Sequence, residues 1–181
     1  MGKIKNALIS VSDKENLSMI LKVLKKNKVK IISSGGTYIS IKKLGYKCPN
    51  IIDPLTNVPE DMKVGDNNFI MNEVHIHPLV KIGNNNFIWS GSIISHHIKV
   101  GNHCWFTSGS SVAGNTEIKN NCFFGLNSSI INNIKVGNKC FVGAHSLVSK
   151  NLKNKSVVIS PPSTKHTLNS EQFTLLLNNK F

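Results

Sequence analysis

The chain has 181 residues, of which 40% are hydrophobic, so it can form a domain with a core and is not wholly disordered. No apolar run approaches the ~18 residues of a membrane-spanning helix, and the N-terminal apolar stretch is too short for a signal peptide. We therefore expect a soluble, cytoplasmic protein with no membrane partner.

The net charge is +13, but all basic residues are Lys and they are scattered. Without Arg, which grips guanine and phosphate with two hydrogen bonds, we expect no nucleic-acid partner and favour a small anion.

Residues 1–47 predict a strand–helix–strand–helix unit. The stretch KNALISVSDK predicts a strand and then a helix start, with Ser12 or Asp13 as N-cap. The helix that follows has an apolar face made by Leu17, Ile20, Leu21 and Leu24. A second strand, VKIISSGGT, ends in a glycine turn, and TYISIKKLGYK predicts a short helix. Such a small set of elements cannot bury an independent core, so the unit docks on the rest of the chain or remains loose.

The ISVSDK and SSGGT motifs resemble the start of the methylglyoxal-synthase-like domain of the bifunctional purine biosynthesis enzyme, its IMP cyclohydrolase half. That resemblance implies a cradle for a nucleotide phosphate, made by backbone N–H groups at helix starts. The matching positions are Ser10, Ser12, Lys14, Ser34, Gly35, Gly36 and Thr37. The resemblance covers about a quarter of the chain and then stops. Purine-nucleotide binding is thus one alternative function, and a fused remnant without activity is the other interpretation.

From residue 64 the sequence repeats at every sixth position. Fifteen consecutive steps are aliphatic or Phe: Val64, Ile70, Ile76, Ile82, Ile88, Ile94, Val100, Phe106, Val112, Ile118, Phe124, Ile130, Val136, Val142 and Val148. A period of six fits neither an α-helix nor a flat strand, but it fits a short strand and a corner. Motifs such as VGDN, IGNN and VGNH recur at every third hexapeptide, so three hexapeptides make one triangular coil. We predict a mainly β fold, a left-handed parallel β-helix of about five coils over 64–150, after a linker over 48–63.

The repeat also accounts for most of the cysteines. The position two before each aliphatic residue is predicted to point inward and is small: Ser92, Cys104, Ser110, Thr116, Cys122, Ser128, Cys140 and Ser146. Cys104, Cys122 and Cys140 fall in one column, with one cysteine in each successive coil. With no C-x-x-C pair in the chain, we expect stacked small buried residues and no metal site.

These repeats resemble those of the bacterial hexapeptide acyltransferases, and residues 62–150 are similar to the NeuD-like sugar acetyltransferases. The resemblance implies acetyl-CoA as acyl donor, a sugar or nucleotide-sugar acceptor, and a homotrimer with its active site in the cleft between protomers. The family's catalytic His falls at His96, and the glycine whose N–H faces the thioester carbonyl falls at Gly114. Leu126 and Ala144 match positions whose backbone contacts the CoA arm.

His96 suits the role of general base because the pKa of an imidazole lies near neutrality. Many relatives carry an acidic residue after this His, whereas here His97 follows, so both histidines are catalytic candidates and the group that orients His96 stays open. His145 also departs from the pattern, since it places an imidazole where CoA would run. The alternatives are a surface His in a trimer seam and a non-catalytic β-helix that serves as a binding or scaffold protein.

Residues 151–181 leave the repeat. SPPSTKHT predicts an extended segment, and LNSEQFTLLLNN predicts a short terminal helix. We expect this helix to cap the open end of the prism, because exposed strand edges promote aggregation.

Overall fold

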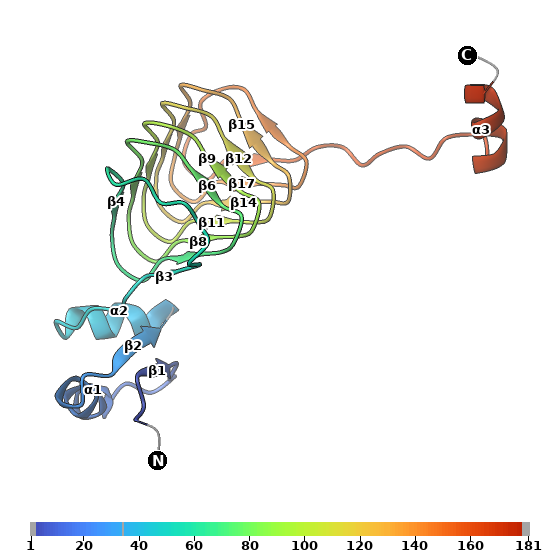
Figure 1. Cartoon of the computed structure of the whole chain (residues 1–181). Helices are drawn as coiled ribbons and strands as arrows, with labels where there is room; N and C mark the ends of the chain where they lie inside the picture. The colour runs from blue at the N-terminus through green and yellow to red at the C-terminus, as the bar shows by residue number, and fades with distance from the viewer. Residues whose placement is uncertain (1–2, 34, 179–181) are drawn as a thin grey trace.

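The computed structural model describes residues 3–33 and 35–178. A triangular prism of stacked coils forms the centre of the molecule (Figure 1). A small α/β unit lies at the N-terminal end of the prism, and an extended segment leads away from its other end to a short helix. The expected mainly β fold, a parallel solenoid of hexapeptide repeats, is confirmed.

The N-terminal unit contains β1 (Asn6–Ile9), α1 (Leu17–Lys26), β2 (Lys30–Ser33) and α2 (Gly35–Lys43), in the predicted order. The two strands pair in parallel, with Asn6 opposite Lys30. Two details differ from the prediction. Helix α1 begins at Leu17 with Asn16 as N-cap, because the Asp13 carboxylate instead accepts the N–H of Glu15 in the preceding loop. Only Leu17 and Leu21 of the predicted apolar face are buried, while Ile20 is 44% exposed.

Each face of the prism is a parallel sheet of two-residue strands. The first, here called the lysine face, contains β4 (Lys63–Val64), β7 (Lys81–Ile82), β10 (Lys99–Val100), β13 (Glu117–Ile118) and β16 (Lys135–Val136). The second, the aromatic face, contains β3 (Ile51–Ile52), β5 (Phe69–Ile70), β8 (Phe87–Ile88), β11 (Trp105–Phe106), β14 (Phe123–Phe124), β17 (Phe141–Val142) and β19 (Val157–Val158). The third face contains β6 (His75–Ile76), β9 (Ile93–Ile94), β12 (Ser111–Val112), β15 (Ser129–Ile130) and β18 (Leu147–Val148).

The hexapeptide periodicity maps directly onto the core. Of the fifteen aliphatic or Phe positions, all are buried except Val64, which lies in the first coil and is partly buried. All eight small positions predicted to point inward are also buried. Within the repeats, each strand pairs with the equivalent strand of the next coil, for example Val100 with Ile118. Each coil therefore covers the apolar interior of the next.

The solenoid extends past the predicted range at both ends. Residues 48–63, expected as a linker, include β3, which pairs with β5 and starts the aromatic face. At the other end β19 pairs with β17, and Leu152 bridges Val136. The last coil is two residues shorter than the others, with Val158 opposite Val142. A count of six residues from Val148 therefore no longer reaches an inward residue of this coil. This is why the periodic pattern in the sequence ends at Val148.

One interior column changes chemistry partway along the prism. With one residue from each coil, it contains Asn50, Asn68, Asn86, Cys104, Cys122 and Cys140. The Asn86 side-chain amide donates to the Gly101 carbonyl at 3.0 Å, and the Cys104 thiol donates to the Lys119 carbonyl at 3.1 Å. The cysteine thiols thus donate the hydrogen bonds to the next coil that the asparagine amides donate earlier in the column. They are free and buried, as the sequence predicted, and burial raises the pKa of Cys140.

The terminal helix forms as predicted, as α3 (Ser170–Asn178), but it does not lie where the prediction placed it. It stands away from the prism at the end of the extended segment, so it does not cap the coil stack (Figure 1). Its apolar side chains, Phe173, Leu175, Leu176 and Leu177, are 40–62% exposed.

Candidate functional site

His96 and His97 lie at the corner where the third face passes into the lysine face, between β9 and β10. His97 has φ 60°, the left-handed conformation that this corner requires, and its N–H donates to the Pro78 carbonyl. Both side chains are exposed, and their Nδ1 atoms lie 3.0 Å apart with the rings nearly perpendicular. One Nδ1 must donate and the other accept, so the tautomers of the two imidazoles are coupled.

The coil above brings Gly114 against His96. The Asn115 N–H donates to the His96 carbonyl at 3.1 Å, which fixes the two corners relative to each other. A Cβ on Gly114 would lie 2.5 Å from Cε1 and 2.7 Å from Nε2 of His96. The imidazole therefore occupies the space that any other residue at position 114 would fill.

The Gly114 N–H makes no hydrogen bond within the part of the chain that the structure describes. Its neighbours are both paired, since the Ala113 N–H donates to the Ile130 carbonyl and the Asn115 N–H to His96. An unpaired N–H beside an exposed imidazole is the arrangement that acyl transfer needs, namely a donor for a developing oxyanion beside a base.

Leu126 and Ala144 lie together at a different corner, between the aromatic face and the third face. The His145 N–H donates to the Leu126 carbonyl at 2.8 Å, so His145 lies in this corner beside them. Neither the Leu126 N–H nor the Ala144 N–H is paired among the described residues. A single chain thus groups His96, His97 and Gly114 at one edge of the third face, and Leu126 and Ala144 at the other edge.

A groove of about 440 Å³ lies directly beside the histidine corner, lined by His97, Lys99, Asn115, Thr116, Glu117, Asn133 and Lys135. Glu117 is partly buried and lies in register between Lys99 and Lys135. The sequence prediction missed this groove and its polar lining. The recurrence of a charged residue at Lys99, Glu117 and Lys135, once in each coil, was the signal that could have indicated it.

The loops predicted to cradle a phosphate do converge. The Thr37 hydroxyl, near the start of α2, donates to the Val11 carbonyl at 3.0 Å and accepts the Val11 N–H at 3.2 Å, which joins Gly35, Gly36 and Thr37 to the loop that carries Ser12. The Lys14 ammonium, however, is turned back on its own loop and donates to the carbonyls of Val11 and Ser12. Ser34 lies outside the described residues.

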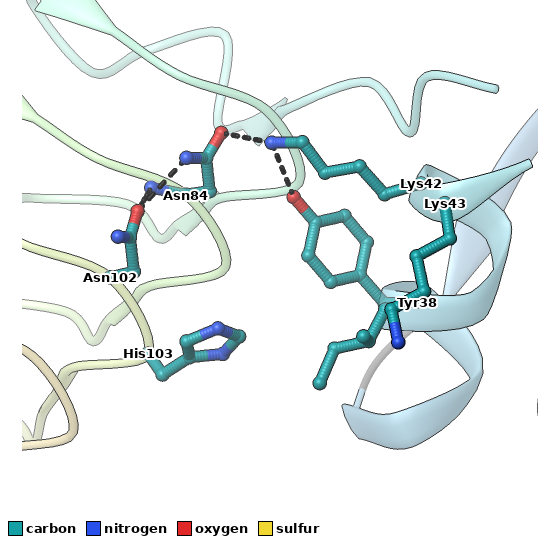
Figure 2. Close-up of a pocket in the computed structure, with 7 residues that line it drawn as sticks. Tyr38, Lys42, Lys43, Asn84, Asn102 and His103 are labelled. Atoms are coloured by element: carbon teal, nitrogen blue, oxygen red, sulfur yellow. Dashed lines mark hydrogen bonds between the residues drawn. The ribbon is translucent and has the colours of Figure 1, made fainter. Parts of the chain in front are cut away.

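Helix α2 docks on the prism around a cavity of about 320 Å³ (Figure 2). The Lys42 ammonium donates to the Asn84 side-chain oxygen at 3.0 Å and to the Tyr38 hydroxyl at 3.4 Å, and it lies 3.9 Å from the Asp66 carboxylate. Figure 2 shows His103 across the cavity from the Tyr38 ring. The N-terminal unit is therefore attached to the prism by polar contacts rather than left loose.

Two further features are absent from the residues that the structure describes. Those residues contain no group of three or more His, Cys, Asp or Glu side chains that could hold a metal ion. None of the helices described here has the length and apolar character needed to span a bilayer.

Comparison with known proteins finds a family that shares the hexapeptide repeat and solved structures that share the fold. Residues 61–96 match the family described as bacterial transferase hexapeptide (six repeats). The structure is similar to that of PerB from Caulobacter crescentus in complex with CoA and GDP-perosamine, with a TM-score of 0.69 and 23% identity over 84% of this chain and 75% of that one. It is also similar to the acetyltransferase domain of PglB from Neisseria gonorrhoeae in complex with acetyl coenzyme A, with a TM-score of 0.71 and 14% identity over 91% and 100% of the two chains.

A separate, local similarity is to a purine biosynthesis protein. Sixty residues are 43% identical to the bifunctional purine biosynthesis protein PurH of Leptospira biflexa. The match covers 33% of this chain and only 12% of that protein, so this chain spans a small part of the purine enzyme. The resemblance expected from the ISVSDK and SSGGT motifs is thus found again as a local similarity.

Proposed function

We propose that this protein is an acetyl-CoA-dependent O- or N-acyltransferase that modifies a sugar or nucleotide-sugar. The observation that carries the proposal is the packing of the His96 imidazole against Gly114, whose N–H has no partner among the described residues. The hexapeptide fold supports the same function. Structures similar to it include PerB in complex with CoA and GDP-perosamine, and the acetyltransferase domain of PglB in complex with acetyl coenzyme A.

In the proposed reaction His96 acts as the general base. It removes the proton from the acceptor amine or hydroxyl while that group attacks the thioester carbonyl carbon. The carbonyl π electrons move to oxygen, and the Gly114 N–H donates to the resulting oxyanion. When the tetrahedral intermediate collapses, the C–S bond breaks and the His96 imidazolium returns the proton to the thiolate of CoA. His97, 3.0 Å from His96 between their Nδ1 atoms, holds the imidazole in place.

The separation of the two corners supports a site shared between subunits. In one chain His96 and Gly114 lie at one edge of the third face, and Leu126 and Ala144 lie at the other. One CoA molecule that touches both pairs would take them from two protomers. A cyclic trimer provides such contacts, since each of its interfaces joins two different surfaces of the chain.

The aromatic face supplies apolar surface for this assembly. Phe69, Phe87 and Trp105 stack with ring centroids 4.6 and 4.4 Å apart, and Phe123 stacks on Phe141 at 5.0 Å. Trp105 and Phe141 remain 38% and 44% exposed in the single chain. Apolar patches of this kind on a soluble protein mark interaction surfaces.

The function is tested by following CoA release from acetyl-CoA in the presence of amino- and hydroxyl-bearing sugars and nucleotide-sugars. Turnover should require both substrates and should be lost in the His96→Ala variant. A well-folded protein that transfers no acyl group to any of these acceptors would support the scaffold alternative instead.

A further inference from the structure

Lysines are concentrated on one face of the prism. The first residue of each two-residue strand points outward, and on the lysine face these residues are Lys63, Lys81, Lys99, Glu117 and Lys135. None of the corresponding positions on the other two faces is Lys: Ile51, Phe69, Phe87, Trp105, Phe123, Phe141, Val157, His75, Ile93, Ser111, Ser129 and Leu147. Since all three faces come from the same Lys-rich sequence, composition alone does not explain this segregation.

Three of these lysines form a continuous row, here called the lysine ladder: Lys63, Lys81 and Lys99, each opposite the next in the sheet. Neighbouring strands lie about 4.8 Å apart, and like charges directly opposite each other destabilise a sheet. Among the described residues none of the three ammonium groups makes an ion pair or a hydrogen bond. Glu117 lies opposite Lys99 in the sheet and borders the row at that end. A row of three exposed like charges can attract an anion.

The ladder borders a groove that has room for such an anion. The groove measures about 420 Å³ and is lined by Lys63, Val64, Gly65, Lys81, Ile82, Gly83, Lys99 and Val100. Gly65 and Gly83 let the coils stack closely there, since a Cβ on either would lie 2.5–2.6 Å from a backbone or amide oxygen of the next coil. The ladder ends two residues from His97, so the groove leads to the histidine corner.

We propose that the lysine ladder binds a pyrophosphate and is the subsite for the phosphates of a nucleotide-sugar acceptor. This inference rests on the proposed acyl transfer and specifies its acceptor class. Two or three ammonium groups in a row match the charge and length of a diphosphate. The ladder runs from His97 toward the N-terminal unit, whereas the predicted CoA contacts at Gly114, Leu126 and Ala144 run toward the C-terminal coils. The ladder is therefore on the acceptor side of the catalytic corner.

A second copy of the chain is a poorer occupant. It would bring 22 basic but only 9 acidic residues, so it offers few carboxylates for a lysine row. A nucleic acid is also disfavoured, because the chain contains no Arg and the row is only three lysines long.

The binding step is tested without catalysis, by calorimetric titration of the full-length protein with inorganic pyrophosphate at constant ionic strength. Lys81→Gln should weaken pyrophosphate binding about 10-fold or more, because hydrogen bonds to charged groups contribute that much. Lys81→Arg should largely retain it. Lys150→Gln is the matched control, since Lys150 is exposed and off the ladder, and the variant loses the same charge. Equal binding by Lys81→Gln and the wild type, or equal loss in both Gln variants, would overturn the proposal.

Kinetics then assign the pyrophosphate to its substrate. Lys81→Gln should raise KM for the nucleotide-sugar about 10-fold and leave KM for acetyl-CoA unchanged. A rise in KM for acetyl-CoA instead would place the donor on the ladder and overturn the acceptor assignment. If pyrophosphate binding depends on Lys81 but no sugar is acylated, the ladder stands and the proposed acyl transfer fails. If sugars are acylated but pyrophosphate binding does not depend on Lys81, the proposed acyl transfer stands and the ladder proposal fails.

Discussion

Adding one methyl group at Gly114 should disable the proposed base without removing it. In the structure a Cβ on Gly114 would lie 2.5 Å from Cε1 of His96, whereas ordinary van der Waals contact begins at 3.4 Å. Because the His96 side chain is exposed and Gly114 has no left-handed φ, the ring can move away while the backbone stays in place. The imidazole must shift by about 1 Å, and a misplacement of that size can cost about 10²-fold in rate. We therefore expect Gly114→Ala to lower kcat about 100-fold, with the fold intact by circular dichroism and thermal melting.

A double-mutant cycle separates this effect from general damage. In a His96→Ala background the added methyl group meets no ring, so Gly114→Ala should cost nothing further. The two changes would then be strongly non-additive, as expected for residues in direct contact. The kcat of all four proteins is obtained from initial rates of CoA release with saturating acetyl-CoA. Unchanged kcat in Gly114→Ala, or additive losses in the double variant, would show that His96 and Gly114 do not act together.

Four further outcomes are expected. His96→Ala should lower kcat by about 10²–10⁴-fold with acetyl-CoA affinity nearly intact, and His97→Ala should cost less; a larger loss in His97→Ala would reverse the two roles. Sedimentation at micromolar concentration should give a trimer, and a stable monomer would remove the shared site. Acetyl-CoA at about 100 Kd should stabilise the fold by about 2.7 kcal/mol, while IMP should not; a melting shift with IMP alone would favour the purine-nucleotide alternative. Asn86→Ala should lower the free energy of unfolding by about 2–5 kcal/mol in urea titrations, because it leaves the buried Cys104 N–H and Gly101 carbonyl without partners. An unchanged urea midpoint would contradict the structural role of the interior asparagine and cysteine column.

The fold of the prism was readable from the sequence because its interactions repeat at a fixed interval. A buried residue at every sixth position and a coil for every three hexapeptides specify the strands, the core and the small inward positions without knowledge of distant contacts. The same interval placed Gly114 one coil above His96, and the structure brings them into contact. The column of Cys104, Cys122 and Cys140 follows from the same interval, since three hexapeptides separate each cysteine from the next.

Where the interval breaks, the sequence was insufficient. The shortened last coil hid β19, and the strand β3 lay in residues that were expected to link two domains. The position of α3 depends on which surface its apolar side chains meet, and nothing in its local pattern specifies that surface. The docking of α2 rests on long-range contacts of Lys42 and Tyr38 with the prism, which no periodicity in the sequence predicts.

The sequence by itself determined a hexapeptide prism with His96 and His97 at one corner, since local hexapeptide steps fix both the core and the corners. Only the tertiary structure decided how these corners relate to one another. It placed Leu126 and Ala144 across the third face from His96, and it left the Gly114 N–H without a partner among the described residues. The physical reason is that closing the coil brings equivalent residues of successive coils into register, and a side chain's neighbours across strands are set by that closure rather than by its neighbours along the chain.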